Sequence, residues 1–198
     1  MKILILSAIA LLLNATADAQ YRKESQESQD RLVGKREWVS PPLPLENGRI
    51  VYSENVKVAN LGRESLFKNA LEWYNYNYKS ADTRLTIEKA EEGRLSGTGL
   101  IKYNAAAAGG GEVPIIFHFD LFIRDGEYAY RFYDMYGVDG SGRFEYADMY
   151  REDRSTYIKP RWDKRYRYEM LSDMNTMIEM SIAHLMQAMS KNPSVVTN

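Results

Sequence analysis

The sequence predicts a two-layer α+β domain in which a five-stranded antiparallel sheet is covered on one face by two helices, in the order β-α-β-β-β-β-α. Three observations lead to this prediction. Two stretches repeat their apolar residues at helical spacing, and the stretches between them alternate with a period of two. The dipeptide Asp125-Gly126, between two alternating stretches, is a strong hairpin signal. A sheet with one apolar face and two amphipathic helices can bury its apolar surface by placing both helices on that face.

Length, composition and charge exclude several classes of function. The chain has 198 residues, of which 44% are hydrophobic and 27% charged, and its formal net charge is −1. A nucleic-acid partner is not expected, because a general nucleic-acid binder is strongly basic. The chain has no cysteine, which excludes disulfides, thiol catalysis and thiolate metal sites. With only two histidines, His118 and His184, neither a zinc enzyme nor a conventional catalytic triad is expected, and no metal or cofactor is implied.

The first residues of the chain predict export. Lys2 precedes an apolar run over residues 3–13, and Ala17 and Ala19 are small residues before the expected cleavage point. This layout is typical of a secretory signal peptide, here residues 1–19. The alternative is a membrane anchor, but the run is shorter than the roughly 20 apolar residues that a spanning helix needs. We therefore expect an exported protein that is soluble after cleavage and has no transmembrane segment.

Composition divides the rest of the chain into a leader, a domain and a tail. Residues 20–44 are predicted to be a polar leader and a proline-rich tether, because they hold too few apolar side chains to offset the entropy lost on ordering. Residues 45–190 are predicted to form a single α+β domain. Residues 191–198 are predicted to be a flexible tail.

The elements of the first half of the domain follow from changes of period. A strand is predicted over residues 50–58, which alternate after an Asn-Gly turn signal. A helix is predicted over residues 62–78, where apolar residues at helical spacing lie opposite charged ones. Residues 84–89 and 94–103 alternate again and are predicted to pair as strands. The alanine and glycine run over residues 105–111 is interpreted as a connection and not as a phosphate loop, because no Gly-Lys-Ser/Thr follows it.

The hairpin over residues 113–135 can be predicted pair by pair. A two-residue turn at Asp125-Gly126 places residue 124 opposite residue 127 and thereby fixes all other pairs. One face of the hairpin is apolar and is predicted to belong to the core, with the pairs Ile123/Tyr128, Leu121/Tyr130 and Phe119/Phe132. The other face, which we call the open face, has matched charges as a solvated sheet does and carries the pairs Arg124/Glu127, Phe122/Ala129, Asp120/Arg131 and His118/Tyr133.

A C-terminal helix is predicted from a broad apolar stripe that consists of Leu171, Met174, Ile178, Ile182, Leu185 and Met189. Methionines can form an adaptable binding surface, but packing in the core is the simpler interpretation of this stripe. His184 lies at its border. The stretch 137–167, ahead of this helix, has no clear period. Its Asp139–Arg143 segment lacks the glycine and the acidic residue that a calcium loop requires at fixed positions, so no metal site is predicted there.

Several of these residues resemble a known family. The matching segments are Val56–Val58, Gly62–Trp73, the strand start Gly93–Gly99 and the hairpin Phe119–Tyr128. They resemble secreted bacterial proteins grouped as domain of unknown function 4468, which are described as having a TBP-like fold. The resemblance covers roughly Leu45–Met135 and implies a TBP-like domain in the periplasm or at the outer membrane face. It implies no catalytic residues, and the fold name implies no DNA partner for an exported protein.

The first candidate site lies on the open face of the hairpin. His118 and Asp120 are two residues apart along one strand, about 6.5 Å, and Arg131 and Tyr133 stand opposite them. A base, an acid, a cation and a phenol on one patch can hold an anionic ligand or carry out acid–base chemistry. The alternative is an ordinary solvated sheet face on which Asp120 pairs with Arg131.

The second candidate site is the segment 157–168, YIKPRWDKRYRY, in which basic and aromatic residues interleave. Arg161, Trp162 and Arg165 are the side chains expected to contact a ligand, because aromatic rings stack on sugars or bases and basic groups hold phosphates or carboxylates. The alternative is that Asp163 caps the last helix, that the basic residues are solvated, and that the rings pack on the core.

Together these features predict a non-enzymatic binding or assembly module of the cell envelope, whose partner is an envelope protein or an anionic or glycan polymer. One alternative is an envelope hydrolase that acts on a polar polymer through His118 and Asp120. Another is a structural component that joins a complex through its leader and its methionine-rich helix. A covered pocket around His118 would favour the hydrolase, and a bare sheet would favour the module.

Overall fold

The structure is a computed structural model, and it describes residues 40–78, 80, 82–105, 110–139, 142–151 and 164–191. The predicted signal peptide and most of the predicted leader lie outside the described residues. Arg161, Trp162 and Asp163 lie outside them as well.

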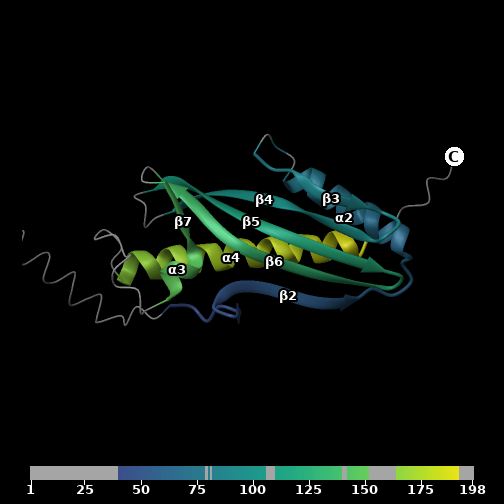
Figure 1. Ribbon diagram of the computed structural model, residues 1–198, viewed down its shortest axis with the longest axis horizontal. Helices are drawn as coiled ribbons and strands as arrows, with labels where there is room; N and C mark the ends of the chain where they lie inside the picture. Colours follow the sequence, from purple (N-terminus) through teal and green to yellow (C-terminus); the bar gives the residue numbers. More distant parts are fainter. Residues whose placement is uncertain are drawn as a thin grey trace, which may run out of the picture. The chain divides into compact units, whose positions relative to one another are not determined.

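An antiparallel sheet forms the centre of the fold (Figure 1). Its strands have the order β1-β2-β6-β5-β4-β3, and β7 pairs with β6 beside this path. The strands are β1 (Leu45–Glu46), β2 (Arg49–Lys57), β3 (Leu85–Lys89), β4 (Arg94–Ala105), β5 (Gly111–Arg124), β6 (Glu127–Asp139) and β7 (Gly142–Glu145). The described helices are α2 (Arg63–Asn77), α3 (Tyr146–Tyr150) and α4 (Lys164–Met189).

The helices cover one face of this sheet, so the predicted two-layer α+β architecture is confirmed. Both long helices lie on the same side of the strands in Figure 1, and their apolar sides are buried against the sheet. The indole of Trp73 in α2 lies 5.5 Å from the ring of Phe119 in β5 and 6.1 Å from that of Phe132 in β6, centroid to centroid. The predicted stripe of α4 is buried along its whole length, and it consists of Leu171, Met174, Ile178, Ile182, Leu185 and Met189.

The strand count was predicted too low, because the sheet has seven strands and not five. The two additional strands are β1, with two residues, and β7, with four. Alternation cannot be recognised over so few residues, so the sequence shows only the turns beside them. At the first of these turns, Asn47 and Gly48 both have positive φ, 50° and 75°. The short helix α3 directly follows β7 and was missed for the same reason.

The hairpin has the predicted register at every pair. Arg124 lies opposite Glu127, and the pairing continues unbroken to His118 opposite Tyr133. Phe119 and Phe132 are fully buried on the core face, whereas Phe122 on the open face is 47% exposed. The two-residue turn therefore determines which side of each strand faces the helices.

The same turn also anchors the first long helix. Gly62 is the N-cap of α2 and provides no side-chain cap. Instead, the backbone N–H of Arg63 donates to Oδ1 of Asp125, at 2.7 Å. A carboxylate at this position satisfies one of the free amides of the first turn and interacts favourably with the helix dipole. Asp125 thus fixes the hairpin and the start of α2 to one another.

Candidate functional site

The structure brings together the four residues predicted on the open face. His118 and Tyr133 are cross-strand partners, as are Asp120 and Arg131. The rings of His118 and Tyr133 are nearly parallel, at an interplanar angle of 27°, with centroids 5.7 Å apart. The guanidinium of Arg131 lies 5.6 Å from the centre of the Tyr133 ring, within the range of a cation–π contact.

The expected ion pair between Asp120 and Arg131 is wrong. Arg131 instead donates from Nη2 to Oε2 of Glu46, at 2.8 Å. Asp120 accepts a hydrogen bond from the hydroxyl of Ser96, its cross-strand neighbour in β4, at 2.5 Å. The reason is the short strand β1, which was not predicted: it carries Glu46 to this face beside β2, where it provides Arg131 with another carboxylate.

Tyr133 is suited to donating a hydrogen bond from this face. Burial raises the pKa of its phenol, and the nearby carboxylate of Asp120 raises this pKa further. A phenol is protonated at neutral pH even at its ordinary pKa of about 10, and a raised pKa only extends this range, so Tyr133 is a donor there and not a base. The single O–H of Tyr133 is directed to Asp120, so the patch offers a partner the stacked rings of His118 and Tyr133.

A shallow depression lies at one end of this face. Its volume is about 300 Å³, and its lining includes Glu46, Ser53, Phe122 and Arg131. The ring of Phe122 is 47% exposed, and the guanidinium of Arg94 lies 5.4 Å from its centre. Of the four candidate site residues on this face, which are His118, Asp120, Arg131 and Tyr133, only Arg131 lines the depression. His118 and Asp120 therefore lie outside this depression.

The basic-aromatic segment is only partly described. Residues 164–168 of this segment form the first turns of α4. Arg165 donates from Nε to Oε1 of Glu169, one turn later in the helix, at 2.7 Å. Three residues of this segment were predicted to contact a ligand. Arg165 has a partner within its own helix, and Arg161 and Trp162 lie outside the described residues. The proposed contacts of this segment remain predictions.

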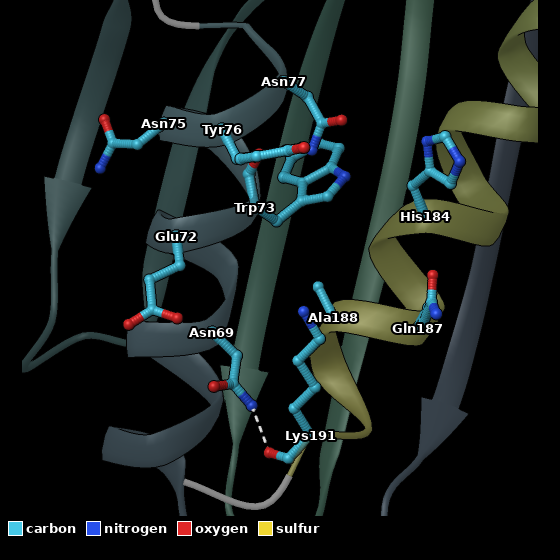
Figure 2. Close-up of a pocket in the computed structure, with 10 residues that line it drawn as sticks. All are labelled: Asn69, Glu72, Trp73, Asn75, Tyr76, Asn77, His184, Gln187, Ala188 and Lys191. Carbon is cyan, nitrogen blue, oxygen red and sulfur yellow. Dashed lines mark hydrogen bonds between the residues drawn. The ribbon is translucent and has the colours of Figure 1, made fainter. Parts of the chain in front are cut away.

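A groove between α2 and α4 was not predicted from the sequence (Figure 2). Its volume is about 620 Å³. The residues that line it are Asn69, Glu72, Trp73, Asn75, Tyr76, Asn77, His184, Gln187, Ala188 and Lys191. One signal was present in the sequence: after Trp73 and Tyr74, which are buried, Asn75, Tyr76 and Asn77 place two amides and a ring on the exposed side of α2. The sequence pattern predicted no role for these three residues, and it placed His184 at the border of the core; His184 is exposed and lines the groove.

Neither a metal cluster nor a membrane helix is found in the part of the chain that the structure describes. No three side chains of histidine, aspartate or glutamate gather there closely enough to hold a metal ion. No described helix has both the length and the apolar composition needed to cross a bilayer.

The architecture defines the class of this protein: it is a two-layer α+β domain of the TBP-like kind, with its described helices on one face of the sheet. Residues 52–136 match the family model described as "Domain of unknown function (DUF4468) with TBP-like fold". The chain therefore carries a DUF4468 domain, which confirms the resemblance found in its sequence.

Two solved structures are similar to this chain. A TBP-like protein from Parabacteroides distasonis ATCC 8503 has a TM-score of 0.62 at 13% sequence identity, covering 75% of this chain and 97% of that one. A DUF4468 family protein from Bacteroides ovatus ATCC 8483 has a TM-score of 0.54 at 12% identity, covering 77% of this chain and 92% of that one. No curated protein sequence matches this chain. At these identities the similarity establishes the fold alone.

Proposed function

We propose that this chain is a non-enzymatic binding module of the bacterial cell envelope and that it docks a protein partner on its open face. The observation that carries the proposal is the exposed ring of Phe122, 47% accessible, beside the depression that Arg131 lines. Aromatic and arginine side chains are enriched at the centre of protein interfaces. The described helices pack on the opposite face of the sheet, so these side chains face outward.

The charges of the open face favour a protein over an anionic polymer. Three cations of this face each have a carboxylate partner: Arg131 with Glu46 at 2.8 Å, Lys102 with Glu112 at 3.3 Å, and Arg124 with Glu127 at 3.7 Å. Paired cations attract a polyanion weakly, and Arg94, a further cation of this face, lies over the ring of Phe122. Exposed ion pairs are worth little in stability, so their members can form new pairs with a protein partner at little cost.

The contacts of His118 and Asp120 support binding more than hydrolysis. The imidazole stacks on Tyr133, and the carboxylate accepts from Ser96. Neither residue lines the depression on this face. An acid–base pair in a hydrolase needs a cavity that surrounds the substrate and excludes water. We therefore propose that these two residues position the surface that a partner contacts.

Photo-crosslinking in the native bacterium tests the proposed docking face. A photoreactive amino acid is placed at Phe122, at Tyr133, or at the control position Ala183, which is exposed on α4. We expect the first two positions to crosslink to the same protein and Ala183 not to do so. That protein, once purified, should bind the mature chain directly, and Arg131→Glu should weaken the binding. Equal adducts from all three positions, or none from the open face, would overturn the proposal.

The location in the envelope is a separate part of the proposal. It is supported by the signal peptide expected over residues 1–19 and by the resemblance to secreted proteins. We expect the mature chain to begin at Gln20, and replacement of Leu11 and Leu12 by Asp to leave an unprocessed precursor in the cytoplasm. N-terminal sequencing of the wild-type protein checks this. If the isolated protein still begins at Met1, export by this route is wrong.

A further inference from the structure

An unpartnered donor lies at the base of the groove between α2 and α4. The side chain of Trp73 is almost fully buried, with 3% exposed, and among the described residues its Nε1 has no hydrogen-bond acceptor. Figure 2 shows the indole reaching from α2 towards α4, so that it lies between the two helices. Buried donors without an acceptor are rare, because the lost interaction with water is not replaced. The N–H is itself buried, so an occupant of the groove supplies the missing oxygen only if the side chains that line the groove part around the indole.

The polar lining around Trp73 suits hydroxyl groups. Asn69 and Asn77 on α2 and Gln187 on α4 line the groove, and each carries an amide that both donates and accepts. The first two are held in place: Nδ2 of Asn69 donates to the backbone oxygen of Lys191 at 2.8 Å, and Nδ2 of Asn77 donates to that of Trp73 at 2.7 Å. A hydroxyl is the ligand group that matches an amide in both directions, since it too donates and accepts.

An exposed aromatic ring stands beside these amides. Tyr76 is 91% exposed, and in Figure 2 its side chain extends on the same side of α2 as that of Trp73. A fully solvated ring offers a flat apolar surface on which the C–H face of a sugar ring can pack, while the hydroxyls at the edge of the sugar reach the amides. The combination of a flat ring and amides therefore fits a ligand with an apolar face and a polar edge.

The charge and size of the groove narrow the ligand class further. Glu72 and Lys191 contribute one negative and one positive charge to the lining, so the groove has no excess of cations for a phosphate or a carboxylate. Its volume of about 620 Å³ falls within the range of about 300–1,000 Å³ that is usual for small-molecule sites. We infer that this groove binds a neutral saccharide, whose hydroxyls contact the amides of the lining and, where the lining parts, Nε1 of Trp73, and whose ring packs on Tyr76. This inference concerns a different surface from the open face and does not depend on the protein partner proposed for that face.

Binding to a printed array of neutral and acidic oligosaccharides tests the inference, with the purified mature chain as the probe. We expect the array to retain the protein on its neutral saccharides. When the neutral saccharide that retains it most strongly is titrated into the protein, the NMR resonance of the Trp73 indole N–H should shift. Tyr76→Ala should weaken binding about tenfold, as expected for the loss of one stacking ring. Tyr76→Phe keeps the ring and should bind as the wild type does. Met180→Ala, at an exposed position of α4 outside the lining of the groove, serves as the control and should bind as the wild type does.

Two variants keep the test independent of folding. Trp73→Phe removes the N–H, but it also alters packing against Phe119 and Phe132, so its melting temperature must be measured beside its affinity. Tyr76 is so exposed that Tyr76→Ala should melt as the wild type does.

Retention on acidic saccharides only, or no retention on the array, overturns the inference. It is also overturned if removal of residues 192–198 shifts the Trp73 resonance and no saccharide does, because the occupant is then the chain's own tail.

Discussion

The two faces of the β5–β6 hairpin use alternate residues of the same strands for different purposes. On the core face, Phe119 and Phe132 are fully buried beneath the helices, and Trp73 packs on both. On the open face, Phe122 stays 47% exposed, and Arg131 pairs with an acid. A phenylalanine is present on each side, so residue type alone does not separate the faces. The position of each phenylalanine in the strand register decides which face it lies on. The register also separates residues that stabilise the fold from residues that are exposed for binding.

The largest effect is expected from truncation of the core face. Phe119→Ala should lower the free energy of unfolding by about 3–5 kcal/mol, because it leaves a cavity among rings that cannot collapse fully. Phe122→Ala should lower it by less than about 1 kcal/mol, since the ring is already half in water. Urea denaturation of both variants checks this. Equal losses would mean that the sheet is covered on both sides, and the comparison would fail.

A smaller loss is expected when volume is added to the core face. A Cβ at Gly99 would lie 2.2 Å from the ring of Phe117, which is itself fully buried. Gly99→Ala should therefore cost about 1–3 kcal/mol, because the ring must move. The matched change on the open face is Ala129→Val, beside the depression, and it should change stability by less than about 0.5 kcal/mol. If both changes are tolerated equally, the core face is less tightly packed than the structure indicates.

Alkaline pH should weaken the core face through its tyrosines. Burial raises the pKa of Tyr78, Tyr103 and Tyr130 to about 12, and burial also raises the pKa of Tyr128. Between the ordinary pKa of about 10 and these values, the unfolded chain loses protons that the folded chain keeps. The contribution of these tyrosines to stability should therefore be constant below about pH 10 and fall as the pH rises towards about 12. The urea midpoint measured across this range checks the sign.

A variant tests whether individual tyrosines cause this loss. Tyr128→Phe removes one buried phenol and keeps the ring, so its stability should fall less steeply with pH than that of the wild type. Stability that does not change with pH up to about 12, or a Tyr128→Phe variant with the wild-type slope, would show that these phenols are hydrated in the folded protein.

The smallest effect is expected for the ion pair on the open face. Arg131 and Glu46 are 50% and 44% exposed, and their charged atoms lie 2.8 Å apart. A double-mutant cycle with Arg131→Ala and Glu46→Ala should give a coupling of less than about 1 kcal/mol, because water screens both charges. A coupling of several kcal/mol would indicate that this pair is buried, and thus that something covers the open face in the isolated protein.

The register was predictable and the short elements were not, for physical reasons. A two-residue turn fixes cross-strand pairs by geometry, so the placement of His118 opposite Tyr133 followed from Asp125-Gly126 alone. Strand β1 has only two residues, and no period can be recognised in it. Because β1 was not predicted, Glu46 was not placed on the open face. Arg131 was therefore paired with Asp120, whereas in the structure it pairs with Glu46.

The groove was beyond prediction because it depends on two helices that are distant in the chain. Periodicity assigns each residue to a side of its own helix, and it placed His184 at the border of the apolar stripe, away from the core centre. It does not give the distance between α2 and α4, nor does it show that the indole N–H of Trp73 would remain without an acceptor among the described residues. Such features arise from tertiary packing, which local sequence patterns do not encode.

The most direct test of the proposed docking face is cysteine labelling in cells. The chain has no cysteine, so Phe122→Cys and the control Ala183→Cys each introduce a single reactive thiol. Both positions should react rapidly with a maleimide in the purified protein, because both are exposed. In the intact envelope we predict that position 122 is protected and position 183 is not. Equal labelling of position 122 in the purified protein and in the envelope would contradict the proposal that a partner covers this face.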